Sequence, residues 1–143
     1  MSEPKRIVLD ANILLRGVFG TRVLELLALY QETVAFYTPD LCIEEAIRSI
    51  PAIATRRRLD PEKTAANLTQ ILLTCIDIVD HSSYDEFEIR ARARISQRDA
   101  SDWPVVATAL LLDAPIWTED RDFFGSGIAT WTSDKIELYL RNS

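Results

Sequence analysis

Acidic side chains stand at four junctions of this sequence, where a strand-like apolar run meets a helix-like run. The acids at these junctions are Asp10, Glu44 with Glu45, Asp99 with Asp102, and Asp120. Carboxylates gathered in one place repel one another and destabilise a fold unless a cation offsets their charge. Hard divalent ions with oxygen ligands, Mg²⁺ or Mn²⁺, are the natural counter-ions. Such an ion activates water and neutralises the charge that develops on a phosphoryl group during an in-line displacement.

The elements around these junctions decide whether the acids meet. Apolar runs and their breaks predict strands over residues 6–9, 33–38, 76–80, 115–118 and 127–131. Helical spacing and capping residues predict helices over residues 21–31 with Thr21 as a cap, 39–49, 61–74, 84–97, a stretch opened by Ser101 or Asp102, and 134–140. Strands that alternate with helices need crossover connections, and these make a sheet parallel. The sequence therefore predicts an α/β fold, a three-layer α/β/α sandwich around a central parallel sheet of about five strands.

This topology brings the four junctions to one edge of the sheet. Asp10 and Asp120 follow strands, and the helices that carry the other acids begin at the same edge. In open parallel sheets, ligands bind beyond the carboxyl ends of the strands. Each acid taken alone also fits a turn, a helix cap or a solvated helix face. Their joint placement at one edge favours a functional site.

The sequence offers no well-supported alternative nucleophile. No serine stands in a GxSxG motif, and the only histidine, His81, is expected in a solvated polar loop. Cys42 and Cys75 lie in apolar segments without a CxxC pair, so both are expected to be buried thiols. No repeat, low-complexity tract or linker divides the chain, and residues 1–143 are predicted to form a single domain.

Four motifs surround the acids: IVLDANILL at Asp10, YTPDLCIEEA at Glu45, RDASDWPVVATAL at Asp102 and PIWTEDRDF at Asp120. In this order and spacing, from about Arg6 to Trp131, the chain resembles the PIN-domain family of metal-dependent nucleases. The resemblance implies the strand order 3-2-1-4-5. It also implies that Asp10, Glu45, Asp102 and Asp120 are the catalytic, metal-binding acids, with Asp99 and Asp122 as supporting acids. Helical periodicity by itself favours Glu44, whereas the family pattern favours Glu45.

The resemblance implies a metal-dependent endoribonuclease that uses Mg²⁺ or Mn²⁺, similar to VapC-type toxins that a partner antitoxin neutralises. Candidate partners are then RNA, an antitoxin protein and a second copy of the chain. The alternative is a PIN-like scaffold that binds RNA or protein without turnover. A haloacid dehalogenase-type phosphatase needs a second acid where Asn12 stands, and a receiver-like domain needs a lysine at a strand end. Lys5, Lys63 and Lys135 are the only lysines, and none of them fits.

The net charge of −6 argues against nucleic-acid binding by bulk charge, yet eight of the 13 arginines lie between Arg48 and Arg98. We expect Arg56, Arg57 and Arg58 to contact RNA from a flexible arm, because residues 54–58 show no apolar reason to pack. Arg90, Arg94 and Arg98, spaced by four, either contact RNA as well or pair with Asp85, Glu86 and nearby acids on a solvated helix. Charges at positions 3, 5, 6 and 10 exclude a signal-peptide core. No run approaches membrane-spanning length, so a cytoplasmic location is expected.

Overall fold

The computed structural model describes residues 3–95 and 100–141, without the side chains of residues 71–73. Its strands are β1 (Lys5–Leu9), β2 (Val34–Pro39), β3 (Ile76–Val79), β4 (Ile116–Trp117) and β5 (Thr130–Trp131). Its α-helices are α1 (Ala11–Phe19), α2 (Arg22–Tyr30), α3 (Asp40–Arg56), α4 (Pro61–Cys75), α5 (His81–Tyr84), α6 (Glu88–Arg94), α7 (Trp103–Leu112) and α8 (Ile136–Leu140). Short 3-10 turns cover η1 (Asp85–Phe87), η2 (Ala100–Asp102) and η3 (Arg121–Phe123).

The strands form one parallel sheet in the order β3-β2-β1-β4-β5, which confirms the predicted order. β1 lies at the centre, where Val8 pairs with Tyr37 on one side and Ile116 on the other. Ile7, Val8 and Leu9 are fully buried, because helices cover both faces of a parallel sheet. A continuous apolar run rather than an alternating one is therefore the sequence signal of this strand.

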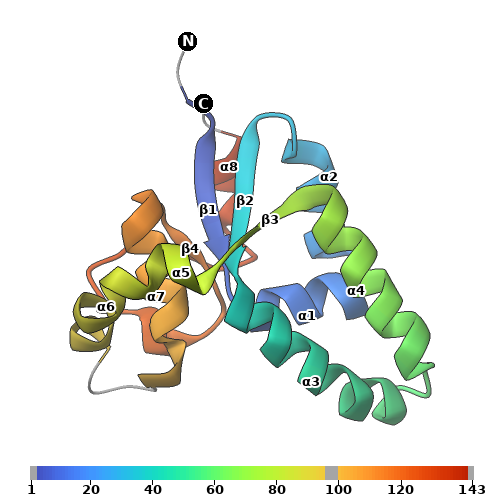
Figure 1. The fold of residues 1–143 in the computed structure, drawn as a ribbon. Helices are drawn as coiled ribbons and strands as arrows, with labels where there is room; N and C mark the ends of the chain where they lie inside the picture. Colours follow the sequence, from blue (N-terminus) through green and yellow to red (C-terminus); the bar gives the residue numbers. More distant parts are fainter. Residues whose placement is uncertain (1–2, 96–99, 142–143) are drawn as a thin grey trace.

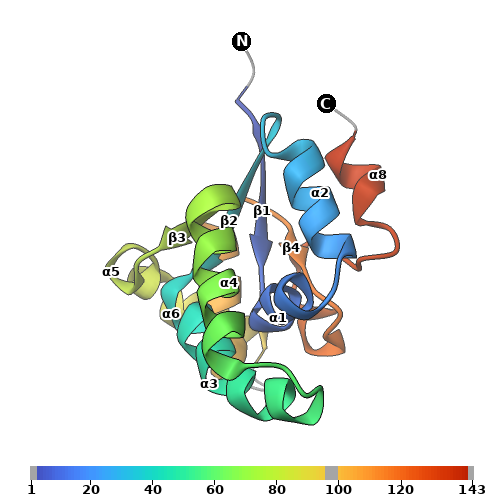
Figure 2. The ribbon, with the colours of Figure 1, turned by 90° about the vertical axis from the view of Figure 1, so that its right-hand side faces the viewer.

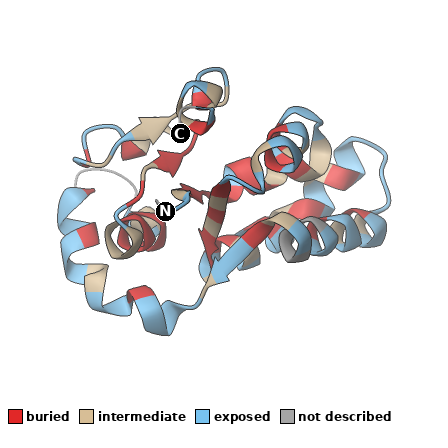
Figure 3. Cartoon of the chain, turned by 90° about the horizontal axis from the view of Figure 1, so that it is seen from above, coloured by how far each residue is buried: buried red, intermediate tan, exposed pale blue. Residues whose placement is uncertain are grey.

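Helices cover both faces of the sheet (Figure 1). α7 packs on one face with α5 and α6 beside it, whereas α1, α2 and α4 lie on the other face. Figure 2 shows α8 next to α2, where the Tyr30 hydroxyl donates a hydrogen bond of 2.7 Å to Glu137. The buried residues follow the sheet and the inner faces of these helices (Figure 3). α7 is buried from Pro104 to Ala109 and is apolar on all sides, as a core helix must be. The predicted three-layer sandwich is confirmed.

Three helices differ from the predictions. α1 was not expected, although the Asp10 carboxylate caps it by accepting a hydrogen bond of 2.9 Å from the Ile13 amide. α3 does not stop near residue 49 but continues through Pro51, whose missing N–H is tolerated on an exposed face. The stretch 84–97 is divided between α5, η1 and α6 in its described part. α2 begins as predicted, but the Thr21 side chain makes no capping hydrogen bond.

Each cysteine has a different environment. Cys42 is buried as expected, and burial is the main reason why the pKa of its thiol lies well above the ordinary value. Cys75 is only partly buried, and its thiol lies 3.7 Å from the Gln31 side-chain oxygen, so that expectation was half right. No helix in the described part of the chain is long and apolar enough to cross a membrane. The single-domain organisation stays a prediction.

Candidate metal centre

A cavity of about 490 Å³ opens at the carboxyl edge of the sheet. Its lining includes all four acids that the resemblance singled out, together with Glu44; these five carboxylates are Asp10, Glu44, Glu45, Asp102 and Asp120. They come from the end of β1, the second turn of α3, the start of α7 and the loop after β4. We call this space the acid cavity. The topology has brought together the junctions that are far apart in sequence.

Asp10 is the most buried of these five acids, with 5% of its surface exposed. One of its carboxylate oxygens accepts the Ile13 amide, and the other accepts the hydroxyl of Thr118, which is itself fully buried. Burial raises the pKa of Asp10 from 3.8 to about 6, although both hydrogen bonds act in the opposite direction. The negative charges of Asp120 and Glu45 are smaller contributions to the same increase. Its two hydrogen bonds therefore hold the carboxylate in a fixed orientation, with other acids nearby.

Thr118 links two of the predicted acids, and the sequence reasoning missed this role. Its hydroxyl donates to Asp10, and its oxygen accepts a hydrogen bond of 2.9 Å from the Asp120 amide. The Asp120 carboxylate in turn accepts a hydrogen bond of 2.9 Å from the Asp122 amide. The signal was available, because Thr118 is the last residue of a predicted strand, at the edge where the acids gather.

A tight carboxylate group forms one wall of this region. Asp102, Asp120 and Asp122 each offer an oxygen, and these oxygens lie within 4.8 Å of one another. Asp102 occupies the N-cap position of α7, but its side chain does not cap the helix, so the simple capping interpretation is wrong. Asp122 belongs to this group without lining the acid cavity. Asp99 lies outside the described residues.

Glu44 and Glu45 both line the acid cavity and are both exposed. Periodicity and the family pattern disagree about which of them is a ligand. The charge of Glu45 acts on Asp10 and on the Cys42 thiol, raising both pKa values. This electrostatic proximity favours Glu45, in agreement with the family pattern.

Two arginines that the sequence reasoning did not select also line the acid cavity. Arg48 follows Glu45 by one turn of α3, and Arg92 enters from α6. The Arg92 guanidinium lies 2.7 Å from the Glu88 carboxylate and 5.3 Å from the centre of the Trp103 ring. An ion pair and an aromatic face thus hold this cation at the rim.

The predicted flexible arm at residues 54–58 is wrong. Ala54 is fully buried, and α3 continues to Arg56. The chain then turns through Arg58, at a φ of 59°, and the Leu59 amide donates a hydrogen bond of 2.8 Å to the Ala54 carbonyl. This is a Schellman ending of a helix, which fixes the backbone. All three arginines are exposed, and Arg57 donates a hydrogen bond of 3.3 Å to the Phe19 carbonyl.

The expected pairing of Arg90 and Arg94 with Asp85 and Glu86 is not observed in the described ranges, and their contact with RNA stays a prediction. The Arg90 guanidinium lies 5.2 Å from the Phe87 ring centre, and Arg94 donates a hydrogen bond of 2.8 Å to the Ser126 carbonyl. Arg98 lies outside the described residues.

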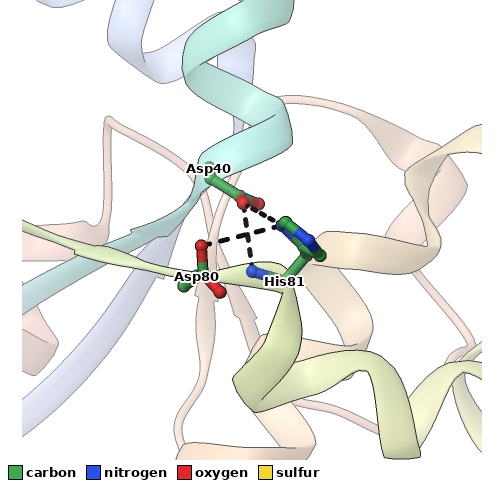
Figure 4. A group of neighbouring side chains, drawn as sticks. All are labelled: Asp40, Asp80 and His81. Atoms are coloured by element: carbon green, nitrogen blue, oxygen red, sulfur yellow. Dashed lines mark hydrogen bonds and ion pairs between the residues drawn. The ribbon is translucent and has the colours of Figure 1, made fainter.

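His81 is exposed as expected, but it does not lie in a loop. His81 begins α5, and its ring Nδ1 lies 2.8 Å from the Asp40 carboxylate and 3.7 Å from Asp80 (Figure 4). Its backbone amide donates a hydrogen bond of 3.0 Å to Asp40, and the Tyr84 hydroxyl donates to the same carboxylate at 2.6 Å. We call Asp40, Asp80 and His81 the Asp40 cluster. It joins the ends of β2 and β3 at the same edge of the sheet.

The residues of the acid cavity suit a hard divalent cation. All of the acids offer carboxylate oxygens, which Mg²⁺ and Mn²⁺ prefer over nitrogen or sulfur. Burial, with smaller contributions from neighbouring acids, raises the pKa of Asp10, so its negative charge is held at a cost in free energy. A cation placed among these carboxylates would remove that penalty, so the donor set and its electrostatics fit the ion.

Comparison with known proteins agrees with this fold. No curated protein matches the sequence. VapBC2 from Rickettsia felis, solved with a DNA fragment from its promoter, is 12% identical at a TM-score of 0.68, over 89% of this chain and 98% of that chain. PAE2754 from Pyrobaculum aerophilum is 17% identical at a TM-score of 0.71, over 97% of this chain and 91% of that chain.

A toxin–antitoxin complex from Klebsiella pneumoniae is 19% identical at a TM-score of 0.60, over 89% of this chain and 97% of that chain. At such low identity these structures establish the fold alone. The family model of the PIN domain matches residues 8–141, a range that contains every acid of the cavity. The chain belongs to the PIN-domain family.

Proposed function

We propose that this protein is a metal-dependent endoribonuclease that acts as the toxin of a toxin–antitoxin pair. The observation that carries the proposal is the acid cavity, where a buried carboxylate with a raised pKa faces further acids from three other segments. Asp10, Glu45, Asp102 and Asp120 are the proposed catalytic and metal-binding residues. Asp122 and Asp99 are proposed as supporting acids.

Mg²⁺ or Mn²⁺, when bound, supplies positive charge that stabilises an in-line displacement at phosphorus and makes water more acidic. The protein supplies orientation. The hydroxyl of Thr118 and the amide of Ile13 fix both oxygens of Asp10, so this ligand is placed before any ion arrives. Arg48 and Arg92 offer guanidinium groups at the cavity to the phosphates of a substrate strand.

The partner part of the proposal rests on the similar structures. The Klebsiella protein was solved as a toxin–antitoxin complex, and the Rickettsia structure is named VapBC2. We infer an antitoxin that blocks the acid cavity of this chain. Expression of the protein alone should then arrest bacterial growth, and the Asp10→Asn variant should not. A homodimer stays a prediction without further support.

The test of the nuclease activity is cleavage of labelled single-stranded RNA by the purified protein. We expect cleavage with added Mn²⁺ or Mg²⁺, none in EDTA, and none by the Asp10→Asn variant purified in parallel. A matched DNA strand serves as the substrate control. Cleavage that survives complete chelation, or that Asp10→Asn retains, would refute the metal mechanism. Tight RNA binding without cleavage would support the inactive scaffold instead.

A further inference from the structure

A second cavity adjoins the acid cavity. It has a volume of about 630 Å³ and lies between α1, the start of α2 and the last turns of α3. Asn12 lines both cavities, so the two spaces meet at the first turn of α1. Figures 1 and 2 show α1 and α3 side by side beyond the carboxyl edge of the sheet. We call this second space the arginine cavity.

The charge of the arginine cavity is opposite to that of the acid cavity. Arg16, Arg22 and Arg57 line it, and Glu119 is the one acid among its described lining residues. Arg16 follows Asn12 by four residues, so both lie on one exposed face of α1 that leads away from the acids. Arg22 forms an ion pair of 3.0 Å with Glu137, which lies outside the cavity lining.

Apolar side chains complete the same cavity. Phe19 lines it, and the Arg57 guanidinium lies 5.2 Å from the centre of the Phe19 ring. Leu15, Val23 and Ile53 provide further apolar lining. Cations next to an aromatic ring and aliphatic groups match a nucleotide, because arginine binds its phosphate and an apolar surface receives its base.

We propose that the arginine cavity binds the nucleotide next to the scissile phosphate of a single-stranded RNA substrate. This inference rests on the proposed nuclease function. The strand passes Asn12, with its reacting phosphate in the acid cavity and the neighbouring phosphate on Arg16 and Arg57. Of the three arginines predicted to contact RNA, only Arg57 lines this cavity, so the contact is made by a fixed groove rather than by an arm.

The experiment compares steady-state cleavage of one single-stranded RNA by Arg16→Ala, Arg57→Ala and the double variant, all with Mn²⁺. We expect KM to rise about tenfold for each arginine, since each loses a charge-assisted phosphate contact, while kcat changes less than about twofold. The slope of log KM against log salt should flatten by about 0.7 for each lost contact to a single strand. Arg16 is exposed, and its side chain forms no hydrogen bond or ion pair with the described residues, so Arg16→Ala remains informative if Arg57→Ala unfolds.

The double variant Lys63→Ala, Arg141→Ala is the matched control, because it removes the same charge from exposed positions outside both cavities. It should leave KM and the salt slope unchanged. An unchanged KM for folded Arg16→Ala, or an equal rise in the control, would overturn the inference. If the variants keep the wild-type KM but escape inhibition by a protein partner, the cavity binds that partner and the inference is wrong. Absence of metal-dependent cleavage by the wild type is a separate result, which refutes the proposed function itself.

Discussion

Two groups of acids lie at the same edge of the sheet, and their carboxylates behave in opposite ways. Asp10 follows β1 and Asp40 follows β2, yet the pKa of Asp10 rises to about 6 whereas the pKa of Asp40 falls below its ordinary value. Burial raises the pKa in both cases. For Asp40, hydrogen bonds from Tyr84 and His81 outweigh that effect.

The difference between the clusters lies in their donors. Asp40 accepts four hydrogen bonds or ion contacts from His81, Tyr84 and the Leu41 amide, and the imidazole adds a positive charge when protonated. Asp10 receives one hydroxyl and one amide, and its charged neighbours are other acids. The Asp40 cluster is therefore satisfied within the protein and serves the fold. We propose that the acid cavity is completed by a cation from outside.

The largest expected effect is the loss of activity in Asp10→Asn. The amide keeps the shape of the carboxylate but loses the charge that holds the cation, so cleavage should fall by about 100-fold or more. Asp40→Asn should keep kcat within about threefold, because its carboxylate belongs to the Asp40 cluster. Initial rates of RNA cleavage measure both. An equal loss of cleavage rate in Asp10→Asn and Asp40→Asn would contradict a functional difference between the acid cavity and the Asp40 cluster.

The second prediction concerns the stability of the metal-free protein. The folded pKa of Asp10 is raised, so its contribution to stability is complete below about pH 4 and is lost as pH rises through about 6. The shift corresponds to about 3 kcal/mol in the free energy of unfolding. Asp10→Asn should lack this component and be more stable than wild type at neutral pH. Urea unfolding of both proteins at several pH values checks this, and an unstable Asp10→Asn would contradict it.

The third prediction is a loss of stability in Asp40→Asn. The variant weakens the hydrogen bonds to His81 and to the hydroxyl of the fully buried Tyr84, and the expected cost is about 1–3 kcal/mol. Asp77→Asn, at an exposed position of β3, is the matched control and should unfold like wild type. Thermal unfolding measures all three proteins. A wild-type melting temperature for Asp40→Asn would show that the Asp40 cluster does not support the fold.

The smallest expected effect belongs to His81. Its hydrogen bond to Asp40 raises the pKa of the imidazole, and the charges of Asp80 and Asp85 act in the same direction. This contribution to stability is complete below about pH 6.5 and is lost as pH rises through the higher folded pKa. The difference in melting temperature between wild type and His81→Gln should therefore shrink with rising pH. A difference that is constant from pH 6 to pH 9 would exclude the ionised pair.

The sequence predicted the sheet and most of the acid cavity because those features depend on local patterns. The run that ends at Asp10 and the element containing Asp120 place their acids through strand order, and the order that the family resemblance implied is confirmed. α1 was missed because Asp10 was interpreted as the end of a strand, although it also caps the helix that follows. The end of α3 was misjudged because Pro51 and the three arginines after it look like the end of a helix. Ala54 is buried in the structure, but one small apolar residue is too weak a sequence signal to predict that the helix continues.

Sequence patterns could not predict the contacts that distinguish the Asp40 cluster from the acid cavity. His81 and Asp40 are 41 positions apart, and Thr118 and Asp10 are 108 positions apart. Their pairing follows from how the strand ends face each other in space. Arg48 and Arg92 both line the acid cavity for the same reason. They belong to α3 and α6, which are far apart in sequence and meet only in the folded structure.

The most direct test of the central claim is the effect of Mn²⁺ on thermal unfolding of wild type, Asp10→Asn and Asp40→Asn. A ligand that binds only the folded state stabilises it by about 2.7 kcal/mol at a concentration 100 times its Kd. We predict that Mn²⁺ raises the melting temperature of wild type and of Asp40→Asn and leaves that of Asp10→Asn unchanged. An equal rise in Asp10→Asn, or no rise in wild type, would contradict a metal centre in the acid cavity.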